Sequence, residues 1–250
     1  MEPVVPSEQT SPSSSSSILP IERAAAALEV LLCSGFPTQL AVITVLSALG
    51  VRLRLADGSL SPTFIFTLTI ADTLLLLGLI AFFFRAHRES LFNELFRSRV
   101  TLRDLTLGLL LVPASFFLIV FVLILLQATV PSLRNVPHNP FADLVKTRTE
   151  AVAFAFVAMI AGGVREEIQR GFVLRRFEQY LGGGTVGLIL FSLAFGLGHL
   201  EQGRDVALAT AVLGAFWGAI YLRRRTVAPA MIGHAGFNLA QVVKFIALGG

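Results

Sequence analysis

Long stretches without charged residues constrain this chain more than any other feature of its sequence. Seven apolar runs carry almost no charge: 30–51, 63–84, 105–130, 151–164, 181–200, 206–222 and 226–243. A helix needs about 20 apolar residues to cross the hydrocarbon core of a bilayer. Transmembrane strands would instead alternate apolar and polar positions in segments of about 10 residues. The runs therefore predict an all-α fold, a polytopic transmembrane helix bundle of about seven spans.

The composition excludes most other fold classes. The chain is 54% hydrophobic and 14% charged, whereas an ordinary soluble domain is about 25% charged. A soluble helical bundle has no core that could accommodate so many uninterrupted runs. Pro37 interrupts the first run, so an eighth span or a re-entrant piece near 20–40 is an alternative. The single cysteine, Cys33, excludes an intrachain disulfide.

Three segments divide the chain. Residues 1–20 contain an unbroken serine run and several prolines, which predicts a disordered tail. Residues 21–149 are expected to form N-terminal transmembrane helices. Residues 150–247 are expected to form a second transmembrane unit, and this unit carries nearly all the intramembrane polar residues.

Basic residues gather at the ends of the apolar runs. The connections at 85–104, 170–176 and 223–225 hold eleven arginines, and the intervening connections hold six Lys or Arg residues. The positive-inside rule places the richer set, and with it the N-terminus, in the cytoplasm. The formal charge of +4 is therefore read as membrane topology and not as nucleic-acid binding.

Two adjacent carboxylates, Glu166 and Glu167, follow one apolar run in the sequence Gly163-Val-Arg-Glu-Glu-Ile-Gln-Arg170. A single charge at bilayer depth costs about 3 kcal/mol on insertion scales, and two neighbouring like charges compound that cost. Intramembrane ionisable groups mark functional sites by default. We therefore expect the pair to be used in the protein's chemistry.

Two histidine motifs follow in later runs, Phe195-x-x-x-His199 and His234-x-x-x-Asn238. Residues four apart share one face of a helix, so each histidine is expected to stand beside the other member of its motif. Each motif alone is also explained by a hydrogen bond between helices. Their occurrence together in the last third of the chain favours a common site.

Helix geometry tests whether the motifs can meet. Glu166 lies about 16 residues before the glycine turn at 182–184 and His199 about 16 after it, so both are about 24 Å from that turn. They reach one depth if the helix that carries Glu166 is long. Arg170 is expected to pair with Glu166, and Glu167, rotated by about 100°, is expected to address other partners.

Together these groups could hold and activate a water within the membrane; the alternatives are a non-catalytic membrane scaffold or immunity factor and a proton-coupled transporter. The sequence contains no zincin motif, no phosphate loop and no nucleophile elbow. Asp72, which has no partner motif in the sequence, is expected to have a structural or hydration role.

Taken in chain order, the motifs resemble those of the CAAX-processing and bacteriocin-processing (CPBP) membrane proteases, which include the type II CAAX prenyl endopeptidases. The resemblance rests on Glu166-Glu167-x-x-Arg170, Phe195-x-x-x-His199 and His234-x-x-x-Asn238. It covers about residues 150–245, so 150–247 is interpreted as a catalytic core of the CPBP type. The family usually has three residues between the glutamates and the arginine, and this chain has two.

The resemblance implies an intramembrane hydrolase in which a carboxylate and a histidine activate water. It assigns catalytic roles to Glu166, Glu167, His199, His234 and Asn238, and supporting roles to Arg170 and Phe195. Glu166 and His199 would activate the water, and His234 and Asn238 would stabilise the oxyanion. The expected substrate is a peptide or lipidated protein at the membrane, with prenylated CAAX-type C-termini as one class, and the expected location is a bacterial cell membrane.

The part played by a metal is left open by the sequence. Glu166, His199 and His234 are the ligands that Zn²⁺ would take, with water in the fourth position. Activation without a metal is favoured because Asn238, beside His234, suits an oxyanion hole better than a zinc shell.

Overall fold

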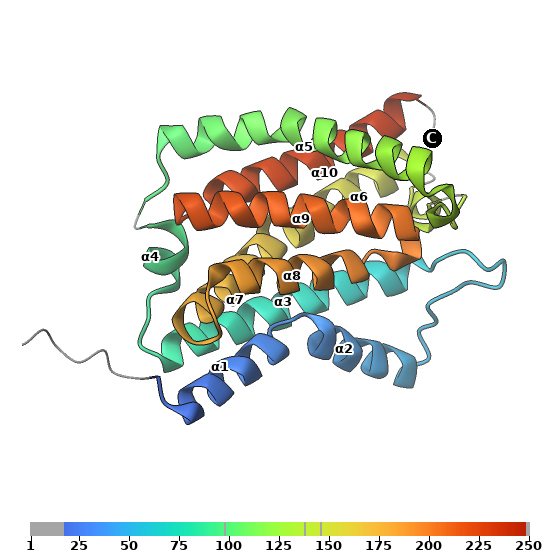
Figure 1. The fold of residues 1–250 in the computed structure, drawn as a ribbon. Coiled ribbons are helices and arrows are strands. Elements are labelled where there is room, and N and C mark those ends of the chain that lie inside the picture. The colour runs from blue at the N-terminus through green and yellow to red at the C-terminus, as the bar shows by residue number, and fades with distance from the viewer. Residues whose placement is uncertain (1–17, 98, 138, 146, 249–250) are drawn as a thin grey trace, which may run out of the picture.

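The computed structural model describes residues 18–248 except 98, 138 and 146, and this part of the chain is a bundle of helices (Figure 1). Within it, the one strand-like pairing is a single bridge between Arg54 and Leu60. The all-α prediction is therefore confirmed. The predicted disordered tail, residues 1–20, falls outside the described residues as far as residue 17, and the first helix begins at Pro20.

The order of the elements follows the apolar runs. The α-helices are α1 (Pro20–Leu32), α2 (Phe36–Ala48), α3 (Pro62–Ala86), α4 (Leu91–Phe96), α5 (Leu102–Thr129), α6 (Arg148–Ala158), α7 (Glu167–Tyr180), α8 (Gly184–Leu197), α9 (Arg204–Arg224) and α10 (Ala228–Leu248). A π-helical segment, η3 (Met159–Glu166), joins α6 to α7, and short 3₁₀ turns are η1 (Pro131–Leu133), η2 (Pro140–Leu144) and η4 (Leu200–Gln202).

Three helices in the described residues, α3, α5 and α9, are each long and apolar enough to cross a membrane. The pair α1 and α2, bent by 44°, adds a fourth candidate as a broken span or forms a re-entrant loop. The expected count of about seven spans is not confirmed. The 14 residues of α8 reach only about 21 Å, and polar residues such as His234 and Asn238 interrupt the apolar surface of α10.

The bend between α1 and α2 has a backbone cause. Gly35 adopts φ of 90°, a left-handed conformation that favours glycine, and Pro37 occupies the first turn of α2. The proline therefore starts a helix instead of kinking one, and the chain changes direction at the glycine. This bend matters below because it forms one wall of the candidate site.

Close packing of the C-terminal helices depends on small residues. A Cβ atom added at Gly214 of α9 would lie 2.8 Å from Cδ1 of Phe195 in α8, and one at Gly218 would collide with Leu188. The face of α9 that carries these two glycines is thus the face that packs on α8. The helix α10 lies against α5 and η3, and α7 is buried along most of its length.

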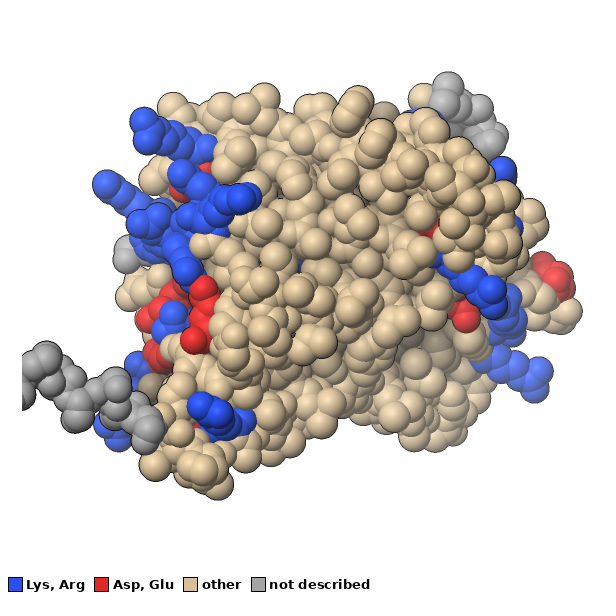
Figure 2. Space-filling view, in the orientation of Figure 1, with Lys and Arg blue, Asp and Glu red and all other residues tan. Residues whose placement is uncertain are grey.

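Charged side chains gather at two ends of the molecule, and a surface almost free of Lys, Arg, Asp and Glu separates them in Figure 2. The three basic segments meet at one end. Arg175 pairs with Glu89 at 3.0 Å, Arg224 pairs with Asp104 at 2.8 Å, and Arg97 donates to the carbonyl of Arg224 at 3.0 Å. Their convergence is what a common side of the membrane requires.

Candidate active site

The glutamate pair lies inside one helical run that extends without a break from Arg148 to Tyr180. Glu166 is the last residue of the π-helical segment η3, and Glu167 is the first residue of α7. Such π-helical turns within α-helices occur frequently at functional sites. The long helix assumed in the depth argument is therefore present, and its one irregular segment ends at the glutamates.

Two glycines before the pair admit α10. A Cβ atom at Gly163 would lie 2.5 Å from Cβ and 2.9 Å from Cα of Ala235, and one at Gly162 would collide with the amide of Asn238. The backbone of η3 and the face of α10 that bears His234 are thus in direct contact. These glycines set how closely α10 packs against η3. The motif analysis missed them, although the Gly-Gly step beside two intramembrane carboxylates is visible in the sequence.

Glu167 is fully buried and is bound by two partners. Its Oε1 atom accepts a hydrogen bond from Nδ1 of His234 at 2.8 Å and pairs with the Arg170 guanidinium. The expected pairing of Arg170 with Glu166 is wrong. Residues three apart also share a helix face, so the spacing permits a pair with Glu167 as well as with Glu166, and the structure has the pair with Glu167.

An aromatic cage surrounds the Arg170 guanidinium. Its Cζ atom lies 5.1 Å from the ring centroid of Phe195, 5.5 Å from that of Phe191 and 5.7 Å from that of Trp217. Aromatic faces attract a cation at such distances. Arg170 and Phe195 are therefore in contact with each other, and their supporting roles stay a prediction.

Glu166 faces a different environment from its neighbour. Its side chain is partly exposed and lines a cavity of about 110 Å³, where His199, Gln169 and Phe195 also lie. Its Oε2 atom is 3.8 Å from Nε2 of His234. The two carboxylates thus have separate surroundings, as the rotation between adjacent helical residues predicts.

His199 lies just beyond the end of α8, in the turn before η4, and not within a helix as the spacing suggested. The reason is local, because α8 ends at Leu197 and Gly198 follows. The four-residue relation to Phe195 nevertheless holds, since Nδ1 of His199 contacts the Phe195 carbonyl at 2.9 Å. A carbonyl only accepts hydrogen bonds, so Nδ1 carries the proton and Nε2 of the neutral ring is left as an acceptor.

His234 is buried against Trp217, with ring centroids 3.8 Å apart. The Trp217 indole is held in turn by a hydrogen bond from Nε1 to Oγ of Ser115 at 3.1 Å. Asn238 donates from Nδ2 to the carbonyl of Ala158 at 3.0 Å, at the start of η3. Neither His234 nor Asn238 lines the cavity, and His234 approaches Glu166 from outside the cavity lining. No motif in the sequence connects Trp217 or Ser115 with His234.

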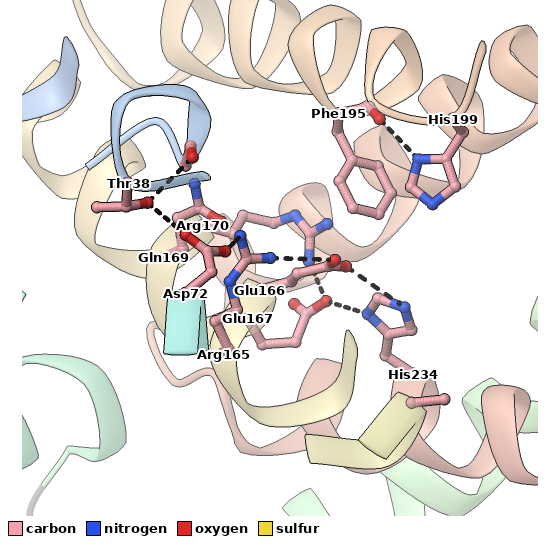
Figure 3. A network of polar contacts seen from close by, with 12 residues as sticks. Thr38, Asp72, Arg165, Glu166, Glu167, Gln169, Arg170, Phe195, His199 and His234 are labelled. Carbon is pink, nitrogen blue, oxygen red and sulfur yellow. Dashed lines mark hydrogen bonds and ion pairs between the residues drawn. The ribbon is translucent and has the colours of Figure 1, made fainter. Parts of the chain in front are cut away.

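Asp72 has the partner that the sequence did not reveal. Its Oδ2 atom pairs with Nη2 of Arg165 at 2.5 Å, and its Oδ1 atom accepts a hydrogen bond from Thr38 at 2.5 Å. Arg165 also reaches Glu166, with Nη1 3.4 Å from Oε1. Figure 3 shows this chain of contacts from α2 through α3 to the glutamates, with His199 and His234 on the other side of Glu166.

The three residues named as zinc ligands do not fit a metal centre as they are placed. Among the described residues, no group of three or more His, Cys, Asp or Glu side chains is arranged to hold a metal ion. Glu166 and His234 approach each other, and His199 stands across the cavity. We therefore derive no step through a metal.

Comparison with known proteins gives one match. The sequence model of the family described as "Type II CAAX prenyl endopeptidase Rce1-like" matches residues 148–240. This segment contains the glutamate pair and both histidine motifs. No curated protein and no solved structure matches the chain.

Proposed function

The C-terminal segment, residues 148–240, belongs to the Rce1-like type II CAAX prenyl endopeptidase family, and from this premise we propose that the chain is an intramembrane endopeptidase. The reaction is hydrolysis of a peptide bond in a membrane-associated protein. Membership of a protease family supports a hydrolase, and the apolar helices support a location within the membrane.

One observation carries the proposal: Glu166, at the end of η3, and His199, in the turn after α8, line the same cavity. At about 30 Å³ per water molecule in the liquid, the cavity has room for a few waters. A carboxylate and an imidazole at one water are the groups that general-base catalysis uses. An interhelical polar cluster without a catalytic role would need neither the cavity nor a free acceptor nitrogen.

The protonation pattern of His199 suits this role. With its Nδ1 proton held by the Phe195 carbonyl, Nε2 accepts a proton or a hydrogen bond from water. Water attacks the peptide carbonyl as Glu166 and His199 take up its proton. The same proton then passes to the leaving amine, so that the carbon–nitrogen bond breaks and both groups return to their starting states.

His234 is assigned the stabilisation of the oxyanion, with Asn238 in support; because neither side chain lines the cavity, this role requires the substrate carbonyl to reach past Glu166 toward His234. Because Nδ1 of His234 donates to Glu167, Nε2 can donate only when the ring is an imidazolium ion. Glu167 lies beside that ring and balances such a charge. The second amide hydrogen of Asn238 is available, since one donates to Ala158. Donors aimed at developing negative charge are the largest single contribution in many hydrolases.

The substrate class follows from the family and the setting. We assign prenylated CAAX-type proteins or other lipid-anchored peptides, because their scissile bonds lie close to the bilayer where the cavity is placed. The end at which the three basic segments meet is assigned to the cytoplasmic side of a bacterial cell membrane, in accordance with the positive-inside rule. With that end inside, the first described helix starts from the cytoplasm.

The test uses purified protein in proteoliposomes with an internally quenched, farnesylated CAAX peptide. The proposal predicts cleavage by the wild type, loss of cleavage in Glu166→Gln, and normal cleavage in the matched control Glu178→Gln, which alters a partly exposed carboxylate of α7 paired with Arg225. Equal activity in Glu166→Gln and wild type contradicts it. Loss of stability in Glu166→Gln without any cleavage by the wild type favours a scaffold, and loss of proton-coupled uptake favours a transporter.

A further inference from the structure

Arg165 joins the proposed base to a carboxylate from the N-terminal half of the chain. Its guanidinium contacts Glu166 through Nη1 at 3.4 Å and Asp72 through Nη2 at 2.5 Å. Asp72 lies in the middle of α3, and Thr38 of α2 donates to its other oxygen at 2.5 Å. Three segments therefore converge on one cation beside the cavity (Figure 3).

A gain in stability over an apolar pair is a weak reason for keeping this ion pair, although removing one partner alone would be costly. Arg165 is 6% exposed and Asp72 is 3% exposed, so both charges have lost most of their contact with solvent. Replacing a buried ion pair by apolar residues of similar volume is often neutral or stabilising. A pair retained within apolar helices is therefore better explained by what its third partner, Glu166, requires.

That requirement is orientation. Adjacent residues of an α-helix point about 100° apart and do not face each other, so Arg165 contacts Glu166 only while its own side chain is held in place. Asp72 of α3 holds the Arg165 side chain in place through its ion pair. The second glutamate has its own arginine, Arg170, so the helix provides one cation for each carboxylate.

We propose that Asp72 is a positioning residue for Glu166, acting through Arg165. The inference rests on the proposed endopeptidase function and gives a role to the N-terminal half of the chain. Thr38 extends the connection to α2, whose Gln39 lines the same cavity as Glu166. One chain of hydrogen bonds and ion pairs thus holds both Glu166 and the cavity wall that α2 forms.

The experiment is a double-mutant cycle with Asp72→Asn and Arg165→Met in proteoliposomes, read as kcat and KM on the farnesylated peptide. A misplacement of about 1 Å lowers rates about 100-fold, so Arg165→Met is expected to lower kcat by about 100-fold with KM nearly unchanged. Asp72→Asn lowers kcat less, and in the Arg165→Met background it has no further effect, because Asp72 acts only through the arginine. Arg165→Lys, which keeps the cation, recovers part of kcat.

The matched control is Arg176→Met, which removes another buried arginine of the same run, paired with Glu29 at 2.7 Å far along α7. It is expected to lower the melting temperature and leave kcat unchanged. The inference is overturned if the double mutant loses kcat by the product of the two single losses. It is also overturned if the loss of kcat follows the loss of melting temperature across all variants. If Arg165→Met keeps the wild-type kcat while Glu166→Gln is inactive, the inference is overturned and the proposed function stands. If Glu166→Gln itself keeps the wild-type kcat, the proposed function is overturned as well.

Discussion

Glu167 accepts a hydrogen bond of 2.8 Å from Nδ1 of His234 and, through the same oxygen, pairs with Arg170. This one atom connects α7 to α10 and fixes which nitrogen of the histidine carries a proton. Because both members of the Glu167–Arg170 pair are fully buried, removing either charged group leaves the other as a buried charge without its counter-ion.

Glu167→Gln and Arg170→Met are each expected to lower the free energy of unfolding by about 3–5 kcal/mol. The double variant is expected to be closer to the wild type than either single variant, since no isolated charge is left. Reversible unfolding in mixed micelles measures all three. Additive losses in the double variant would show that the two side chains contribute independently.

Contact between η3 and α10 gives a steric prediction. Gly163→Ala places a methyl group against Cα and Cβ of Ala235 at 2.9 and 2.5 Å, and backbone atoms cannot rotate away. Overpacking of this kind costs about 1–3 kcal/mol and moves His234 away from Glu166. We expect a lower melting temperature and reduced cleavage. The control, Gly78→Ala, meets no atom within 4 Å, and equal effects of the two substitutions would contradict the steric account.

The sequence predicted the general nature of the fold and the meeting of the motifs, since long apolar runs and helical spacing depend on local geometry. It did not predict which arginine serves which glutamate. Arg170 lies three residues from Glu167 and four from Glu166, and both spacings permit a pair, so the choice is made by the π-helical segment and by His234. The Asp72–Arg165 pair spans 93 positions, and no local pattern specifies such a contact.

The predicted number of membrane spans, about seven, is not confirmed for a related reason. Apolar runs indicate burial but do not distinguish a membrane-facing helix from one buried by its neighbours. The helix α7 is covered on most sides by protein, and α8 is too short to cross alone. The bend at Gly35 was foreseen as an interruption near Pro37, although the glycine, and not the proline, carries the unusual backbone conformation.

Acid sensitivity should arise at the basic end of the bundle. Burial alone raises the pKa of Glu89, but hydrogen bonds from Arg175, Gln179 and Arg176 outweigh it and hold the pKa below the ordinary value of 4.5. A lowered carboxyl pKa contributes stability above that ordinary value, and the contribution is lost as the pH falls through the folded-state value. Wild type should therefore melt higher than Glu89→Gln at pH 7, and the difference should shrink as the pH is lowered below 4.5. A difference that does not depend on pH would exclude this carboxylate as the cause.

Metal dependence is tested by chelation. Because Glu166, His199 and His234 are not gathered as a ligand set, cleavage is expected to continue after exhaustive treatment of the purified protein with a zinc chelator. Metal content measured on the same sample shows whether stripping was complete. Activity that disappears and returns only with Zn²⁺ would contradict the metal-free assignment.

The central claim is that Glu166 and His199 act together on one water, and a double-mutant cycle tests it most directly. We predict that Glu166→Gln and His199→Gln each lower kcat/KM by about 10²–10⁴-fold, with melting temperatures near that of the wild type. The double variant should be no slower than the slower single variant, because residues that act as a unit have non-additive effects. Losses that multiply in the double variant, or a double variant that still cleaves the peptide at the wild-type rate, would contradict the account.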